Sequence, residues 1–269
     1  MQSGLYGEHV LITGASGGIG QATAKLFNEE GCCLSLHYNK NADQLQKFSS
    51  ELEGDHCIVQ AELSSEEETQ QMFNDSIATF GRIDRLVVSH GIWPEENIPA
   101  NEMTIDQWDR TISINLRAAF LCSKLFLQNL VKFPKDNASI VYIGSTAGVF
   151  GEAGHVDYAV SKAGLNGLML SLKNEIVKIA SRGRVNIVAP GWTITPMTKK
   201  FLEDHKGVRT VLQTMPLRKI ARSMDIAQCI VFLSSDNLAG HISGQLITVA
   251  GGMEGRRLFE PHEIDIERI

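Results

Sequence analysis

Three residues in the middle of the chain could together handle the proton of a carbonyl group. Tyr158 and Lys162 are four residues apart in a segment of helical periodicity, and Ser145 follows a short apolar run that predicts a buried strand. At this spacing two side chains share one face of a helix, so an ammonium group can lie beside the phenol and lower its pKa. The serine hydroxyl can hold a carbonyl oxygen while the phenol exchanges a proton with it. The trio predicts interconversion of a ketone and an alcohol, although such a tyrosine and lysine more often form a solvated surface pair.

A glycine-rich turn near the start of the chain lies in the context that a dinucleotide site requires. Residues 9–13 (HVLIT) predict a strand, and Gly14, Gly18 and Gly20 follow before helical sequence resumes. Glycines let the backbone turn tightly and approach a pyrophosphate, whose charge the N-terminus of the helix favours. The spacing differs from G-x-G-x-x-G, but the order strand, glycine turn, helix predicts a dinucleotide site.

The end of the second predicted strand bears on the choice of dinucleotide. A carboxylate there would bind the ribose hydroxyls of NAD and repel a 2′-phosphate. Here residues 32–37 are followed by Tyr38, Asn39 and Lys40, with no carboxylate and one cation. This favours NADP(H) over NAD(H) by a small margin, although Lys40 could equally be an ordinary solvated lysine.

Two further segments could contribute to a site. Asn115 falls on the apolar stripe of a helix predicted from Thr104 to Leu130, where an amide is either a hydrogen-bonded core residue or part of a site. Pro190-Gly191 predicts a rigid turn after a sixth strand. Residues 197–222 mix Met, Phe and Leu with Lys and Arg, which suits either a mobile lid over the substrate or a pair of surface helices.

Strands alternate with helices along the whole chain. This pattern predicts an α/β fold: a single-domain Rossmann fold with a doubly wound, seven-stranded parallel sheet and helices on both faces. One helix is expected over 66–80, with Ser64 as its N-cap. The domain should occupy residues 1–252 and hold both the cofactor and the substrate site. Residues 253–269 form a charged C-terminal tail, which either packs across a subunit interface or is loosely held.

Composition narrows the partners. The net charge of -6 and the pI near 5.8 argue against binding to nucleic acid or to an anionic membrane surface. No basic region followed by a long apolar stretch opens the chain, so we expect no signal peptide and no membrane span. The five cysteines are odd in number and lack metal-ligand spacing. We expect free thiols, no metal site and a reducing compartment, either the cytoplasm or an organelle interior.

Several of these motifs occur together, in order and at matching intervals, in one known family. Over residues 6–252 the chain resembles the short-chain dehydrogenase/reductases. The matching features are Thr13-Gly14-x-x-x-Gly18-Ile19-Gly20, Asn115, Ser145, Tyr158-x-x-x-Lys162 and Pro190-Gly191.

The resemblance implies roles for these residues. Tyr158 would be the general acid/base, and Lys162 would hold the nicotinamide ribose and lower the pKa of Tyr158. Ser145 would bind the carbonyl group, and Asn115 would hold a water molecule in the proton relay. The family also implies a homotetramer built on the helices that carry Asn115 and Tyr158.

Motifs and resemblance together predict a set of cofactor-binding residues at the strand ends. Those residues are Gly14, Ser16, Gly18, Ile19, Gly20, Tyr38, Asn39, Lys40, Glu62, Leu63, Ser89, Gly91, Tyr158, Lys162, Pro190, Gly191, Thr193 and Thr195.

The chain departs from the family pattern at three places. The fourth strand ends in Val88-Ser89-His90-Gly91 where the family usually has Asn-Asn-Ala-Gly, and His90 could touch the cofactor or simply be packed. Glu62 replaces the usual Asp after the third strand and should still reach the adenine amine. Gly17 stands where NADPH-using relatives often have an Arg, which counts against NADP(H).

Within the family, the chain is most similar to the 3-oxoacyl-carrier-protein reductases, so the expected substrate is a small-molecule or carrier-linked carbonyl compound. A secondary-alcohol, sugar or steroid dehydrogenase is the main alternative. A non-catalytic dinucleotide sensor is an alternative of another class. It would not need Asn115, Ser145, Tyr158 and Lys162 together.

Overall fold

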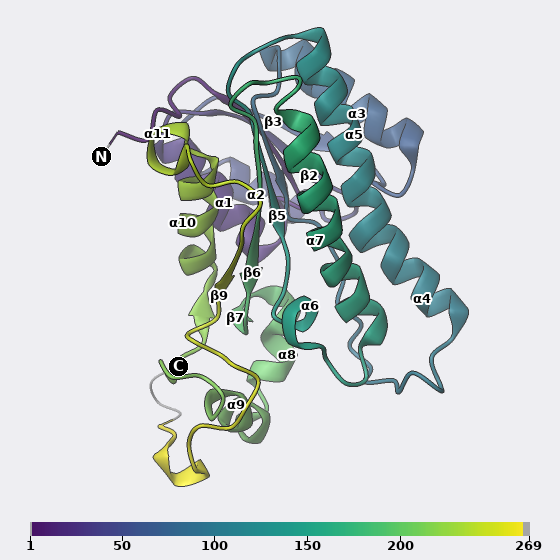
Figure 1. Cartoon of the computed structure of the whole chain (residues 1–269), viewed down its shortest axis with the longest axis vertical. Helices are drawn as coiled ribbons and strands as arrows, with labels where there is room; N and C mark the ends of the chain where they lie inside the picture. Colours follow the sequence, from purple (N-terminus) through teal and green to yellow (C-terminus); the bar gives the residue numbers. More distant parts are fainter. Residues whose placement is uncertain (1, 266–269) are drawn as a thin grey trace.

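One seven-stranded sheet forms the centre of the molecule in a computed structural model that describes residues 2–265 (Figure 1). The strand order is β3-β2-β1-β4-β5-β6-β9, and every neighbouring pair is parallel. The predicted doubly wound fold is confirmed. The strands are β1 (His9–Thr13), β2 (Cys33–Tyr38), β3 (His56–Gln60), β4 (Arg85–Val88), β5 (Ser139–Ile143), β6 (Arg184–Pro190) and β9 (Leu246–Val249).

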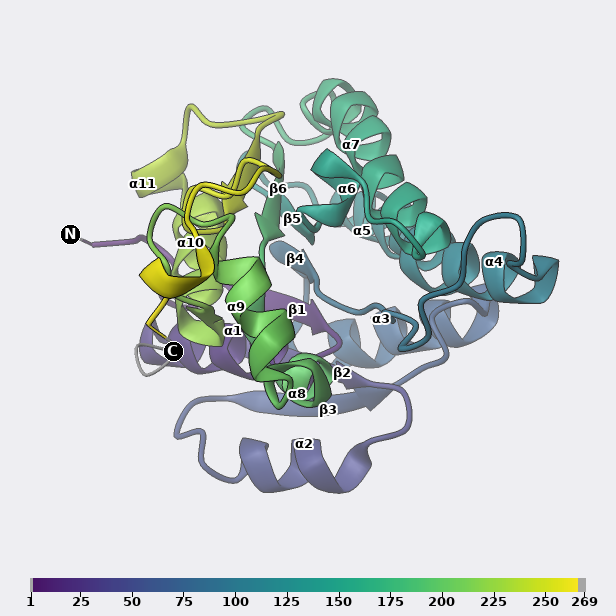
Figure 2. The same cartoon turned by 90° about the horizontal axis from the view of Figure 1, so that it is seen from below.

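Helices cover both faces of this sheet, as Figure 2 shows from one end. On one face lie α3 (Glu66–Phe80), α5 (Ala118–Lys132) and α7 (Val156–Ile176). On the other lie α1 (Gly18–Glu29), α2 (Ala42–Ser49) and α10 (Ser223–Ser234). None of the helices in the part of the chain described here is long and apolar enough to cross a membrane.

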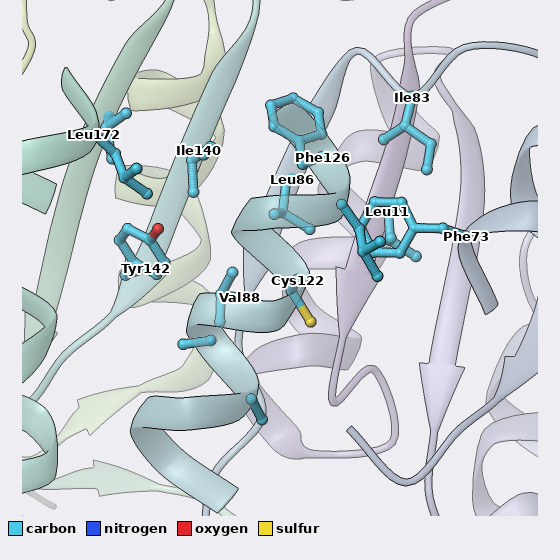
Figure 3. Close-up of a cluster of buried hydrophobic side chains, with 14 of the residues drawn as sticks. Leu11, Phe73, Ile83, Leu86, Val88, Cys122, Phe126, Ile140, Tyr142 and Leu172 are labelled. Carbon is cyan, nitrogen blue, oxygen red and sulfur yellow. The ribbon is translucent and has the colours of Figure 1, made fainter. Parts of the chain in front are cut away.

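Alternating side chains along the strands build the two cores. Leu11 packs toward α3 and α5, whereas Val10 and Ile12 pack toward α1 and α10. Because both faces are covered, most strand residues are buried and the strands are mainly apolar. Figure 3 shows the first core, in which Tyr142 is fully buried and its hydroxyl pairs with Ser123 Oγ at 2.5 Å. Complete burial of one such aromatic ring contributes about 2 kcal/mol.

The helix predicted from Thr104 to Leu130 is present, but it is not uniform. It consists of α4 (Ile105–Ile112), a π-helical turn over Ser113–Arg117, and α5. The π turn includes Asn115, and such turns are frequent at functional sites. No residue pattern signalled this local widening.

The expected N-cap of α3 was wrong by one residue. Ser65, not Ser64, accepts the backbone N–H of Glu68, at 3.3 Å. The hydroxyl of Ser64 instead donates to Glu62 Oε1 at 3.0 Å, which removes it from the cap position.

Short elements gather beyond the carboxyl ends of the strands, at the lower end of Figure 1. They include α6 (Ala147–Phe150), α8 (Lys199–Leu202), α9 (His205–Leu212) and a small sheet of β7 (Thr193–Ile194) and β8 (Ala221–Arg222). A further short helix, α11 (Asp236–Ala239), follows α10. The region 197–222 therefore contains the surface helix pair that was one of its two predicted forms.

The C-terminal tail packs on α9 as far as Ile264. The backbone N–H of Leu258 donates to the carbonyl of Gln213, and Gln213 Nε2 donates to the carbonyl of Phe259 at 2.7 Å. Arg209 Nη1 reaches the carbonyls of Pro261 and Ile264, at 2.7 and 3.1 Å. The alternative of a loosely held terminus is therefore wrong for this part of the tail. Residues 266–269 of the predicted tail, and Met1 of the predicted domain, lie outside the described residues.

Candidate active site

Ser145, Tyr158 and Lys162 meet at the carboxyl end of β5. Ser145 comes just after this strand, and its Oγ accepts the backbone N–H of Ala147 at 3.1 Å. Lys162 Nζ donates to the carbonyl of Ile143 at 2.9 Å and lies 5.9 Å from the centre of the Tyr158 ring. Ser145 and Tyr158 line the same cavity. The fold thus assembles the trio that the spacing predicted, at the strand end where open α/β sheets bind ligands.

Burial, and not the neighbouring cation, dominates the protonation of these groups. It raises the pKa of Tyr158 to about 12, against a smaller lowering by the hydrogen bond with Ser145. It also lowers the pKa of Lys162 to about 8. In the chain alone the Tyr158 pKa is raised and not lowered as predicted, because desolvation of the phenolate is the largest effect and Lys162 is not among the groups that shift it. At neutral pH Tyr158 keeps its proton, which suits a proton donor to a carbonyl oxygen.

Asn115 is a buried residue that ties two parts of the site together. Its Oδ1 accepts the backbone N–H of Ile92 at 2.8 Å, and its Nδ2 donates to the carbonyl of Ile92 and to Ser161 Oγ. Both N–H groups of the amide are therefore used within the protein. A Cβ on Gly91 would lie 3.2 Å from Asn115 Oδ1 and from Lys162 Nζ, so the glycine permits this close approach. The implied water-holding role of Asn115 stays a prediction.

The glycine turn has the form that a pyrophosphate requires. Gly14 has a φ of +66°, and a Cβ on it would lie 2.7 Å from the Cα of His90. A Cβ on Gly20 would lie 2.3 Å from the carbonyl oxygen of Gly14. The N-cap of α1, Gly17, has no side chain to cap the helix, so its first N–H groups can receive an anion. These residues fit a dinucleotide.

Two histidines, one buried and one half-buried, brace this turn. His37 Nδ1 accepts the backbone N–H of Gly14 at 3.0 Å, and its Nε2 faces the carbonyl of Ala61 at 3.0 Å. His90 Nδ1 lies 2.8 Å from Thr13 Oγ1, while its buried Nε2 has no hydrogen-bond partner among the described residues. Burial lowers the pKa of His37 to about 4 and that of His90 to about 3, so both are neutral. The sequence interpretation missed His37, whose only signal was a polar residue inside an apolar strand.

A carboxylate lies beside the end of β2, although that strand itself ends without one. Asn39 Nδ2 donates to Glu62 Oε2 at 2.7 Å, and Glu62 Oε1 accepts from the backbone and hydroxyl of Ser64. Burial raises the pKa of Glu62, but these hydrogen bonds and nearby Lys40 outweigh it and leave the pKa below its usual value. Glu62 is therefore held as an anion within reach of the predicted ribose site.

The remaining predicted cofactor residues also lie at this edge of the sheet. Ser16 and Ile19 belong to the glycine turn and the start of α1, and the backbone N–H of Ser89 donates to Thr13 Oγ1 at 3.1 Å.

Tyr38 and Leu63 pack in the two hydrophobic cores, so their contacts with a dinucleotide would use the backbone. The segment after β6 includes Pro190, Gly191, Thr193 and Thr195, with Thr193 Oγ1 donating to the carbonyl of Gly191 at 3.0 Å.

A largely apolar cavity of about 230 Å³ opens beside Ser145 and Tyr158. Trp192 stacks on Phe201 of α8 at 3.7 Å and meets Trp93 edge to face at 6.0 Å. Trp93 in turn stacks on His155 at 5.0 Å. The sequence interpretation named none of these aromatic residues. The other lining residues are Thr146, Ala147, Phe150, Gly151, Glu152, Gly191, Met197, Thr198 and Met253.

In the described chain, no group of three or more His, Cys, Asp or Glu could hold a metal ion. The geometry fits a dinucleotide on the glycine turn and places a tyrosine in the wall of the cavity at the end of β5.

Comparison with known proteins agrees with this geometry. The family model described as enoyl-(acyl carrier protein) reductase matches residues 14–254. The chain is 34% identical to a 3-oxoacyl-[acyl-carrier-protein] reductase of Thermotoga maritima, over 93% of this chain and 98% of that one. It is 32% identical to the enzyme of the same name from Staphylococcus epidermidis, over 90% and 97%.

A solved structure is also similar over nearly the whole chain. It is a short-chain dehydrogenase/reductase from Brucella melitensis described as a glucose/ribitol dehydrogenase, with a TM-score of 0.83 and 32% identity over 92% of this chain and 97% of that one. The chain belongs to the short-chain dehydrogenase/reductases, NAD(P)(H)-dependent oxidoreductases that act on CH–OH groups.

Proposed function

We propose that the protein interconverts a ketone and a secondary alcohol in the cavity beside Ser145 and Tyr158. The observation that carries this proposal is that both hydroxyls line one cavity, with the Lys162 ammonium beside them. Bound NAD(P)(H) would supply or accept the hydride. Ser145 and Tyr158 would hold the carbonyl oxygen, and the neutral Tyr158 would donate its proton to that oxygen. Lys162 would hold the ribose and stabilise the phenolate that remains.

Carrier-linked 3-oxoacyl groups are the first substrate class to test, because the relatives from Thermotoga and Staphylococcus carry that activity in their names. A secondary-alcohol or sugar dehydrogenase is the second candidate. It is favoured by the similarity to the Brucella glucose/ribitol dehydrogenase.

For the cofactor we propose NADP(H) over NAD(H). Lys40 supplies a cation where a 2′-phosphate would lie, and the oxygens of the nearby Glu62 are already engaged by Asn39 and Ser64. The carboxylate of Glu62 counts against this preference, so we expect a small ratio of affinities.

We also propose a homotetramer in the cytoplasm, built on α5 and α7. Both helices expose large apolar side chains, which a partner surface would cover. These side chains are Phe120 and Val131 on α5, and Val160 and Leu170 on α7.

Replacing Tyr158 by phenylalanine tests the proposed chemistry. The variant keeps the ring but loses the proton-exchanging hydroxyl, so we expect turnover of acetoacetyl-coenzyme A or of a simple ketone to fall by roughly 10²–10⁴-fold. Fluorescence titration with NADPH should give an unchanged dissociation constant. Unchanged turnover would overturn the mechanism, and cofactor binding without turnover in the unmodified protein would favour a sensor.

A further inference from the structure

One carboxylate in the wall of the substrate cavity has no part in the proposed proton transfer. Glu152 lines the cavity together with Ser145 and Tyr158, and it is the one residue with a formal charge among the described residues of that lining. Its side chain is 27% exposed, and its charge is close enough to raise the pKa of Tyr158. Any substrate that reaches Tyr158 must therefore pass or meet this group.

One hydrogen bond, from another loop, holds the carboxylate in place by one oxygen. Trp93 Nε1 donates to Glu152 Oε1 at 3.3 Å, and His155 Nδ1 lies 3.5 Å from the same oxygen. His155 is itself fixed, because its Nε2 faces the carbonyl of Pro94 at 3.0 Å and its ring stacks on Trp93. Within residues 2–265, nothing donates a hydrogen bond to the second oxygen, Oε2. That oxygen remains available to a ligand.

The rest of the lining limits what that ligand can be. Trp93, Trp192 and Phe150 are aromatic, and Met197 and Met253 are apolar. The hydroxyl of Thr198, a polar neighbour, already donates to backbone carbonyls. A substrate with many hydroxyl groups would leave most of them without partners, which costs about 1–3 kcal/mol for each buried group.

An uncharged ketone also fits this wall poorly. It would displace water from Oε2 without donating a hydrogen bond to that oxygen. Burial already raises the pKa of Glu152, which shows that the carboxylate is partly desolvated before a ligand binds. A protonated amine would both donate to Oε2 and balance its charge. Aromatic faces attract cations as well, and two indole rings lie in the same wall.

We propose that Glu152 is a specificity-determining residue that selects ketone or alcohol substrates carrying a protonated amine. The proposal rests on the ketone–alcohol chemistry proposed for the same cavity, and it favours amino ketones over acyl thioesters within that chemistry. The amine pairs with Oε2, while the carbonyl oxygen lies between Ser145 and Tyr158.

Three small ketones of similar size test this inference: N-methyl-4-piperidone, which is protonated at neutral pH, 4-methylcyclohexanone and 4-hydroxycyclohexanone. With NADPH and the unmodified protein, we expect kcat/KM to be about tenfold higher for the amine than for either uncharged ketone, as one ion pair would give. In Glu152→Gln that ratio should fall towards one. Glutamine keeps the oxygen that accepts from Trp93, so the wall should remain intact.

Glu175→Gln is the matched control, because Glu175 is exposed near the far end of α7. It should keep the tenfold ratio. Quenching of tryptophan fluorescence measures the binding of each ketone independently of turnover. Equal binding and turnover of all three ketones, a preference for the hydroxyl ketone, or a ratio that survives Glu152→Gln would overturn the proposal. Turnover of all three ketones without a charge preference would contradict the role of Glu152 and leave the ketone–alcohol function standing. Glu152-dependent binding of the amine without turnover of any ketone would support that role and contradict the ketone–alcohol function.

Discussion

The proposed cofactor side and the proposed substrate side of this sheet edge are built by different means. The cofactor side comprises β1, β2 and the turn 14–20. There the backbone itself forms the binding surface, because a Cβ on Gly14 or Gly20 would collide with neighbouring backbone atoms. The substrate side comprises the loops 92–98 and 145–155, the segment 191–222 and the tail. There the surface consists of side chains, chiefly Trp93, Trp192 and Glu152.

The two kinds of surface should tolerate amino-acid substitutions to different extents. A backbone surface is fixed by steric limits that only glycine satisfies, so a single added methyl group should weaken cofactor binding strongly. A side-chain surface is held by aromatic stacking and a few hydrogen bonds, such as the 3.7 Å stack of Trp192 on Phe201. Substitutions there should change which substrate is accepted and how well, and leave cofactor binding alone.

Gly20→Ala should have the largest effect. Its Cβ would lie 2.3 Å from the carbonyl oxygen of Gly14, so the turn must open. Overpacking of this kind costs about 3 kcal/mol, and we expect the NADPH dissociation constant to rise about 100-fold. Fluorescence titration measures it. Gly167→Ala on α7 is the control, since nothing lies within 4 Å of its Cβ and a helical alanine should stabilise the protein slightly. Unimpaired NADPH binding by Gly20→Ala would remove the distinction between the two sides.

The second-largest effect should come from a lower pH, which should destabilise the fold through two histidines that contact the cofactor turn. The folded pKa values of His37 and His90, about 4 and about 3, lie below the ordinary value of 6.5. Below pH 6.5 the unfolded chain therefore takes up protons that the folded chain does not, and stability falls with pH. We expect these two histidines to lower the free energy of unfolding by about 2 kcal/mol between pH 6.5 and 5.5, because each group reaches its full slope of roughly 1.4 kcal/mol per pH unit only well below pH 6.5.

Urea unfolding at a series of pH values measures this slope. His90→Asn, which cannot titrate, should reduce the slope, and His37 and His9, whose pKa values burial also lowers, should account for the part that remains. His241→Asn alters an exposed histidine and should leave it unchanged. An unaltered slope in His90→Asn would mean that His90 does not couple the turn to pH.

The sequence predicted more of the cofactor side than of the substrate side. Local order along the chain determined the strands and the glycine turn, and the four-residue spacing placed Tyr158 and Lys162 together. Long-range packing decided what was missed. His37 lies within a strand, and its contact with the glycine turn depends on how neighbouring strands pair. Trp93 reaches Trp192 only because the fold brings two distant loops together. The pKa of Tyr158 was misjudged for the same reason, since burial depends on the whole fold.

Arg209→Met should have the smallest effect, and only on the substrate side. Arg209 ties α9 to the tail through the carbonyls of Pro261 and Ile264, and Met253, at the start of the tail, lines the cavity. Loss of these partly exposed hydrogen bonds costs about 1 kcal/mol, so KM for the ketone should rise about fivefold. Lys206→Met on the same helix removes an exposed charge without such contacts and should not change KM. Because the cofactor turn lies on other elements, the NADPH dissociation constant should be the same in both variants as in the unmodified protein. A rise in that constant in Arg209→Met would show that α9 and the tail also support the cofactor side.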